Sequence, residues 1–202
     1  MGCSVSVKSA KVSTYPVSGN TLQDVWASIE KKGPKDPNDN KKVAALTETT
    51  ITVADKWDAE LRGGRCMTSG KMEARVGVKN MTMTVEGAIK MPKLGSSKLS
   101  KAAKKEWDRF IKKLEAHEKE HVTETEKLAE QMGKEIMKIE GVAEGDDDKK
   151  AFEAAKQAFL KEYLKQFSGA LIAKRVTEIH TKFDKSTKHG AKHGAKLDLS
   201  IQ

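Results

Sequence analysis

The chain has 202 residues, a net charge of +9 and an isoelectric point near 9.4. Its length suits a single domain with a sheet-forming half over residues 1–95 and a helical half over residues 96–202. The positive charge comes mostly from lysine, and only 5% of residues are aromatic, which argues against a nucleic-acid reader that uses arginine forks and base stacking. No apolar run approaches the roughly twenty residues that span a bilayer.

The first half predicts strands and one short helix. Residues 5–17 are expected to form a strand that enters a Tyr-Pro turn, and Thr21 starts a capping box for a helix over residues 22–31. Alternating β-branched residues predict a strand between residues 43 and 61, and clearer alternation predicts another over residues 72–91. The second alternation is typical of an antiparallel sheet with one face in water.

The second half predicts helices. No glycine or proline interrupts the chain between Ser100 and Gly133, and the apolar spacing predicts one helix over about residues 100–139. A loop rich in glycine and aspartate follows at residues 141–148, and then a second helical stretch over residues 147–182. The predicted fold is therefore α+β, with an N-terminal antiparallel sheet and a short helix followed by a helical C-terminal half.

A His-Glu-x-x-His motif lies inside the long predicted helix. His117 and His121 are four residues apart, so they project from one helical face and can bind a single Zn²⁺. Apolar residues precede them at helical spacing, so both imidazoles are expected to face the interior. Glu118 lies on the flank of this stripe, where it can act as general base on a metal-bound water. The motif predicts a zinc hydrolase, although a helix rich in lysine and glutamate can also contain it by accident.

A catalytic zinc site usually has three protein ligands, so a third donor is expected elsewhere in the chain. The residue six positions after the motif is Lys127, which is not a zinc ligand. Glu140 is a weaker choice, because it precedes a loop with few apolar residues around it. A better source is the segment over residues 183–190, where a carboxylate, a hydroxyl and an imidazole lie close together before a glycine. His193, in a near-repeat of that segment, is a weaker candidate. The alternative is that this tail is a solvated basic terminus.

Several further segments have recognisable patterns: Tyr-x-Val-x-Gly-x-Thr at residues 15–21, Gly33-Pro34, Cys66 with the strand up to Met91-Pro92, Trp107 to Phe110 before the His-Glu-x-x-His, and Asp184-x-x-Thr187-x-His189-Gly190. Together these segments resemble domain-of-unknown-function family 922, bacterial proteins described as secreted zinc-dependent proteases. Phe183 stands where the family has a tyrosine, so any role of that hydroxyl is absent.

The resemblance implies a zincin-like metalloprotease domain with His117 and His121 as zinc ligands and Glu118 as base. His189 is the first choice for the third ligand because neutral imidazole suits zinc, and Asp184 is the alternative as a ligand or as an outer carboxylate that orients a histidine. The implied activity is that of a zinc-dependent endopeptidase acting on protein or peptide substrates. An extended peptide is expected to pair with a sheet edge, by analogy of fold.

An oxyanion stabiliser is also expected, and the sequence leaves four candidates: Tyr15, Tyr163, His180 and His193. The rival interpretation is a non-catalytic interaction module of the bacterial envelope, built from the Lys/Glu-rich helices, with a structural or vestigial metal site. Metal content separates the two interpretations, because one tightly held zinc per chain favours the enzyme.

The start of the chain bears on location. The first twenty residues lack the apolar core of a signal peptide, so the protein is either cytoplasmic or lacks a leader that has been removed. Gly2-Cys3 resembles the end of a bacterial lipoprotein cleavage site, which favours a secreted, periplasmic or envelope-attached protein with Cys3 as lipid carrier. A disulfide between Cys3 and Cys66 would exclude that lipid, and N-myristoylation at Gly2 or a residue left by cloning are the remaining alternatives.

Overall fold

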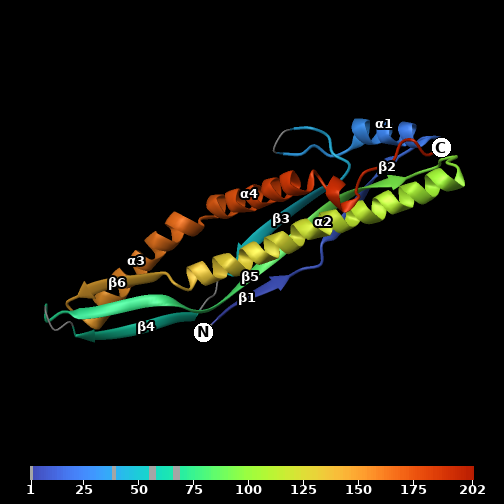
Figure 1. The fold of residues 1–202 in the computed structure, drawn as a ribbon. Helices are drawn as coiled ribbons and strands as arrows, with labels where there is room; N and C mark the ends of the chain where they lie inside the picture. The colour runs from blue at the N-terminus through green and yellow to red at the C-terminus, as the bar shows by residue number, and fades with distance from the viewer. Residues whose placement is uncertain (1, 38–39, 55–57, 66–68) are drawn as a thin grey trace. The chain divides into compact units, whose positions relative to one another are not determined.

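A computed structural model describes residues 2–37, 40–54, 58–65 and 69–202 (Figure 1). The protein is α+β, as the sequence predicts, with strands and one short helix first and a mainly helical half afterwards. The elements in chain order are β1 (Gly2–Val7), β2 (Lys11–Val17), α1 (Leu22–Lys32), β3 (Leu46–Val53), β4 (Asp58–Arg65), β5 (Met72–Leu94), α2 (Lys101–Ile136), β6 (Glu140–Gly145), α3 (Asp148–Phe167), α4 (Gly169–Thr187) and the 3-10 turn η1 (Ala191–His193).

The chain divides into two compact units, and each takes segments from both halves of the sequence. The units therefore do not coincide with the sheet-forming and helical halves. Unit 1 comprises Met1–Val7, Ile51–Val85 and Glu126–Val176. Unit 2 comprises Lys8–Thr50, Glu86–Thr125 and Thr177–Gln202.

Strand β5 is the centre of the sheet. β1 runs parallel to β5, with Gly2 beside Asn80 and Val7 beside Val85, and β2 runs parallel to the last part of β5. β4 and β6 are antiparallel to the first part of β5, and β3 also pairs with it. The sheet is thus mixed, and the expectation of an antiparallel sheet is wrong for β1 and β2. Alternation along one strand reports which face is buried but not the direction of the neighbouring strand.

Two predictions in the helical half are also corrected. The segment expected as a glycine-rich loop contains β6, where Gly141 lets α3 lie directly on the strand; a Cβ there would collide with the carbonyl oxygen of Ala155. The second helical stretch is two helices, α3 and α4, because Ser168 between them is extended, with φ −62° and ψ 154°. The predicted capping box at Thr21 is confirmed, since its hydroxyl accepts the backbone N–H of Asp24 at 3.1 Å.

Unit 1 is held together by apolar side chains. In this unit α3 packs against β6 and β4, and Phe159 of α3 is almost fully buried. A cavity of about 190 Å³ remains between apolar side chains and Tyr163. The buried residues of this unit include Val76, Val78, Met81, Met83, Val85, Met132, Ile136, Phe159 and Phe167. Cys3 is a free thiol, and Cys66, its partner in the disulfide considered as one alternative, lies outside the described residues.

Unit 2 packs α1 and the first half of α2 around one apolar cluster. Capping at Thr21 fixes the start of α1, whose buried face joins the buried stripe of α2 and Leu197 from the C-terminal segment. Arg109 of α2 donates hydrogen bonds to the carbonyl oxygens of Gly194 and Lys196, and so fixes that segment against the helix. No helix among the described residues is both long enough and apolar enough to cross a membrane.

Candidate metal centre

Helix α2 presents two imidazoles to the interior of unit 2. His117 and His121 are 3% and 4% exposed, and they continue the buried stripe of Phe110 and Leu114. Their ring centroids are 4.9 Å apart, as expected for residues four apart on one helical face. Both histidines therefore face inward, as the apolar spacing predicts.

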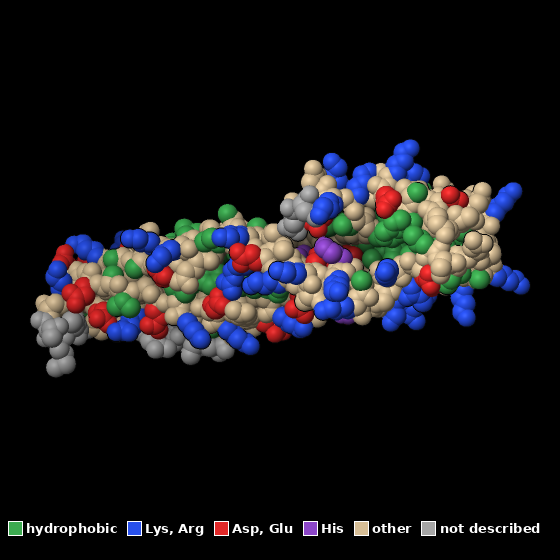
Figure 2. Space-filling view, turned by 45° about the horizontal axis from the view of Figure 1, so that its top comes forward, with side chains coloured by type: hydrophobic (Ala, Val, Ile, Leu, Met, Phe, Trp, Pro, Cys, Tyr) green, Lys and Arg blue, Asp and Glu red, His purple; other side chains and the backbone are tan. Residues whose placement is uncertain are grey.

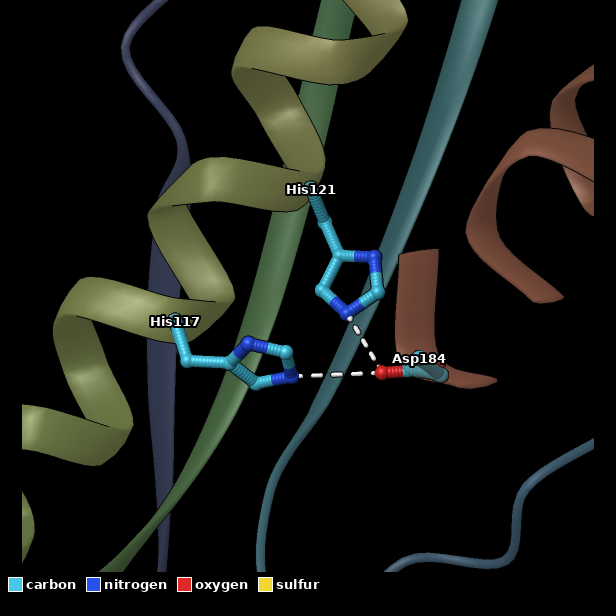
Figure 3. Close-up of side chains that lie close together, drawn as sticks. All are labelled: His117, His121 and Asp184. Carbon is cyan, nitrogen blue, oxygen red and sulfur yellow. Dashed lines mark hydrogen bonds and ion pairs between the residues drawn. The ribbon is translucent and has the colours of Figure 1, made fainter. Parts of the chain in front are cut away.

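Asp184 of α4 lies opposite both imidazoles (Figure 3). Nε2 of His117 and Nε2 of His121 are each 3.2 Å from the same carboxylate oxygen, Oδ1. The three donor atoms all lie within 4.8 Å of one another. Zinc bonds of about 2.1 Å at tetrahedral angles place neighbouring ligand atoms about 3.4 Å apart. The spacing of this triad therefore suits one Zn²⁺.

The chemistry of the donors also fits zinc. Burial alone would raise the pKa of the Asp184 carboxyl, but hydrogen bonds from His117 and His121 outweigh that effect and hold the pKa below its usual value. Asp184 is therefore a carboxylate at neutral pH. Two imidazoles and one carboxylate make a ligand set found in zinc enzymes that keep a fourth position for water.

The surroundings of the two rings depart from the usual pattern. An imidazole that binds zinc through Nε2 usually donates its Nδ1–H to a carbonyl or carboxylate. Nδ1 of His117 and Nδ1 of His121 are buried, with no hydrogen-bond partner among the described residues. Ring packing orients them instead: Phe183 stacks on His117 with centroids 5.1 Å apart, and His180 packs on His121 at 4.8 Å.

Glu118 is buried beside the histidines and is held by Thr47 of β3. The Thr47 hydroxyl donates to Oε2 of Glu118 at 2.7 Å and lies 3.2 Å from the backbone carbonyl oxygen of Glu118. Burial raises the pKa of the Glu118 carboxyl, and the hydrogen bond from Thr47 acts in the opposite direction. A carboxyl in this position, oriented and withdrawn from bulk water, is suited to accept a proton and release it again.

His180 packs against His121 and is itself held by two threonines. Its Nε2 is 2.9 Å from Oγ1 of Thr125 and 3.1 Å from Oγ1 of Thr49, and Thr125 donates to the backbone carbonyl of His121 at 2.9 Å. Burial, and then the charge on His121, lower the pKa of His180 from 6.5 to about 4. His180 is therefore neutral at neutral pH, and its ring is engaged by the two threonines.

The end of α4 brings Asp184 and His189 together. The backbone N–H of His189 donates to the carbonyl of Asp184 at 2.9 Å, and Lys188 adopts a left-handed conformation with φ 52°, as in a Schellman helix end. Gly190, with φ 76°, follows directly and lies against His117, where a Cβ would be 2.9 Å from the ring Cγ. Because glycine has no Cβ, the chain can pass this close to the imidazole of His117 without displacing it.

The other predicted residues have different surroundings. Nδ1 of His189 is 3.9 Å from Oδ1 of Asp184, and the His189 side chain is 65% exposed. His189 forms a group with Asp36 and Asp184, and it does not share the group of the two helix histidines. Figure 2 shows histidine side chains at the molecular surface, beside acidic side chains.

The four predicted oxyanion stabilisers are spread over the chain. The Tyr15 hydroxyl donates to the carbonyl of Ala44 at 2.7 Å, and Nδ1 of His193 is 3.0 Å from Oε2 of Glu120. His180 is bonded to the two threonines, and Tyr163 belongs to unit 1. Sequence reasoning did not find Thr47 or Asp36, because each comes from a distant segment and neither has a local pattern that marks it.

The sequence profile of a family described as "Bacterial protein of unknown function (DUF922)" matches residues 12–190. The chain belongs to the DUF922 family. This match includes every residue of the centre described above, from Asp36 and Thr47 to His189. No curated protein and no solved structure matches the chain. Membership of DUF922 is therefore confirmed, whereas the family description names no activity.

Proposed function

We propose that this DUF922 protein is a zinc-dependent endopeptidase whose metal is held by His117, His121 and Asp184. One observation carries the proposal: two buried imidazole nitrogens from α2 lie 3.2 Å from one ionised carboxylate oxygen of α4, with Glu118 buried next to them. The geometry favours Asp184 over His189 as the third ligand, because His189 is more distant and largely exposed.

Each residue then has a defined task. Zn²⁺ in this triad would lower the pKa of a coordinated water and polarise the carbonyl of the scissile peptide bond. Glu118 accepts a proton from the attacking water and delivers it to the leaving nitrogen. Thr47 holds the Glu118 carboxylate in one orientation, so that the base does not need to be positioned during the reaction.

The same contact supports a peptide substrate. Thr47 belongs to β3, and among the described strands β3 pairs with β5. An extended peptide that added to the other edge of β3 would form backbone hydrogen bonds beside Glu118. We propose accordingly that the substrate binds as an extended strand and that the protein works in the bacterial envelope or outside the cell.

Elemental analysis of the purified protein after dialysis tests the metal. We expect one zinc per chain, retained in the Glu118→Gln variant and lost in His121→Ala. His193→Gln is the matched comparison, because His193 lies outside the triad but groups with His117 and Glu120; loss of zinc in this variant would instead place the metal in that second group. A protein that keeps no zinc in any buffer, or keeps it fully in His121→Ala, rules out the proposed ligands.

Hydrolysis of denatured casein, with and without a chelator, tests the reaction. We expect activity that the chelator abolishes and that zinc restores, and no activity in pure Glu118→Gln that still contains zinc. Zinc-loaded Glu118→Gln that cleaves at the wild-type rate would show that the base is wrong. Zinc-loaded wild-type protein that cleaves no peptide would instead favour a non-catalytic binding module.

A further inference from the structure

We propose that His189 is a catalytic residue, which donates a ring N–H to the oxygen of the scissile carbonyl as negative charge develops there, and that Asp36 positions its ring. This inference rests on the proposed peptidase function and deepens it. It gives His189 a role toward the substrate in place of a role as zinc ligand.

The first support is the place of the His189 ring. Its Nδ1 is 3.9 Å from Oδ1 of Asp184, the same oxygen that contacts His117 and His121 at 3.2 Å. His189 is therefore next to the triad without being one of its three mutually close donors. A substrate carbonyl drawn to a metal in the triad would come within a few ångströms of this ring.

The second support is the contrast in exposure. The His189 side chain is 65% exposed, whereas Asp184 is 18% exposed and the two helix histidines are almost fully buried. Zinc ligands are normally enclosed, while a group that must meet an incoming substrate has to be reachable from solvent. Among the described residues we find no hydrogen-bond partner for Nε2 of His189, which leaves this atom available to a substrate.

Asp36 supplies the positioning. Its side chain is 7% exposed, and its carboxylate forms one group with the donor atoms of Asp184 and His189, all within 4.8 Å of one another. A buried carboxylate close to an exposed imidazole restricts the orientations that the ring can adopt. The backbone fixes where the His189 side chain leaves the chain, because Lys188 and His189 both adopt left-handed conformations that residues other than glycine rarely take.

The other three candidate donors that the sequence offers in this unit each have a partner within it. The Tyr15 hydroxyl donates to the carbonyl oxygen of Ala44, and Nε2 of His180 is hydrogen-bonded to two threonine hydroxyls. Nδ1 of His193 is 3.0 Å from the Glu120 carboxylate. A donor aimed at a developing oxyanion typically contributes about 100-fold to 1,000-fold to kcat. Two partly exposed histidine rings of this unit lie beside the triad. His193, 39% exposed, packs on His117 with ring centroids 6.0 Å apart, and His189, 65% exposed, lies beside Asp184 and is the more open of the two to a substrate.

The test compares two histidines of the near-repeat Lys-His-Gly-Ala, which occurs at residues 188–191 and again at residues 192–195. In zinc-loaded protein, His189→Gln should lower kcat about 100-fold with little change in KM, because the contact forms only in the transition state. His193→Gln should stay within about twofold of wild type. Equal kcat values for His189→Gln and wild type would overturn the inference but leave the peptidase proposal intact.

A binding experiment gives a readout that does not depend on turnover. A phosphonamidate peptide, which imitates the charged tetrahedral oxygen, should bind His189→Gln about 100-fold more weakly, while the affinity for zinc itself stays as in wild type. Loss of zinc from His189→Gln would make His189 a ligand and overturn the inference. A second zinc per wild-type chain that disappears in Asp36→Asn would do the same, because Asp36, Asp184 and His189 would then form a metal site.

The role of Asp36 is tested by a double-mutant cycle. Asp36→Asn should lower kcat about tenfold, yet cause no further loss in a His189→Gln background, because it acts through that ring. Independent, multiplicative losses would show that Asp36 only supports the fold. Wild-type protein that takes up zinc but cleaves nothing removes the peptidase proposal and this inference together.

Discussion

The two units bury different chemistry. Among the described residues, unit 1 has a core of apolar side chains, whereas the buried polar and charged side chains all belong to unit 2: Asp36, Thr47, Glu106, His117, Glu118, His121, Thr125 and Thr187. Burying a polar group costs free energy unless a partner compensates for it, and apolar burial does not carry that cost. Unit 1 is therefore organised for stability, whereas the polar interior of unit 2 is where we propose the metal site.

The largest expected effect tests the apolar side of this comparison. Phe159→Ala should lower the free energy of unfolding by about 3–5 kcal/mol, because it leaves a cavity in the core of unit 1. Urea unfolding measures this change, and Leu164→Ala, on the exposed side of the same helix, is the control. Zinc affinity of the folded variant should stay unchanged; a parallel loss of zinc would mean that the two kinds of core are not separable.

Zinc removal tests the polar side. When zinc is present at about 1,000 times its dissociation constant, binding adds about 4 kcal/mol to the free energy of unfolding. A chelator should therefore lower the urea midpoint of wild type. His121→Ala should show no such response. If chelation leaves the wild-type midpoint where it was, the polar interior of unit 2 does not depend on zinc.

Removing one buried hydroxyl sharpens the comparison within the centre. Thr47→Val keeps the side-chain volume but deletes the donor to Glu118, so we expect kcat to fall about tenfold, equivalent to about 1.4 kcal/mol. Zinc content and KM should be unaffected. Thr47→Ser retains the hydroxyl and should recover most of the rate. Equal losses in both variants would attribute the effect to packing alone.

The smallest effect concerns a buried carboxylate of unit 2 outside the centre. Hydrogen bonds from Arg109 lower the pKa of Glu106, even though burial opposes this, and the backbone N–H of Asp198 adds to the effect. Because the folded pKa is below the unfolded value of about 4.3, the stability from Glu106 is present above that pH and is lost as pH falls through the folded pKa. Glu106→Gln should therefore cost about 1 kcal/mol at pH 7.

The pH dependence of that difference is the measurement. Unfolding free energies of wild type and Glu106→Gln should converge as the pH falls below about 4. In that range the protonated Glu106 is neutral, as glutamine is at every pH. A difference that stays constant from pH 7 to pH 3 would show that the Glu106 charge contributes no stability.

Local patterns account for what could be predicted from sequence. The helix spacing of His117 and His121, the capping box at Thr21 and the alternation in β5 involve residues close in the chain, and the structure contains all three features. Parallel pairing of β1 and β2 could not be predicted, because it depends on segments about 80 residues away. Glycines that suggest a loop at residues 141–145 instead allow close contact between α3 and β6.

The same distinction separates the parts of the centre. The spacing of the motif on α2 places Glu118 beside both histidines, so the position of the proposed base could be predicted. Thr47, which orients it, is 71 residues away in the chain and has no pattern of its own. The choice between Asp184 and His189 depends on the geometry of one helix end, where a turn of a few residues decides which side chain faces inward.

The distance along the chain between the three donors has a consequence for how the protein matures. His117 and Asp184 are 67 residues apart, and closing a flexible loop of that size costs about 4 kcal/mol in chain entropy. During synthesis His117 and His121 leave the ribosome before Asp184. Until Asp184 follows, only two of the three proposed ligands are present. Under the proposed zinc-peptidase function, tight zinc uptake would therefore wait until α4 has docked, and a nascent chain would gain the proposed activity only at the last step of folding.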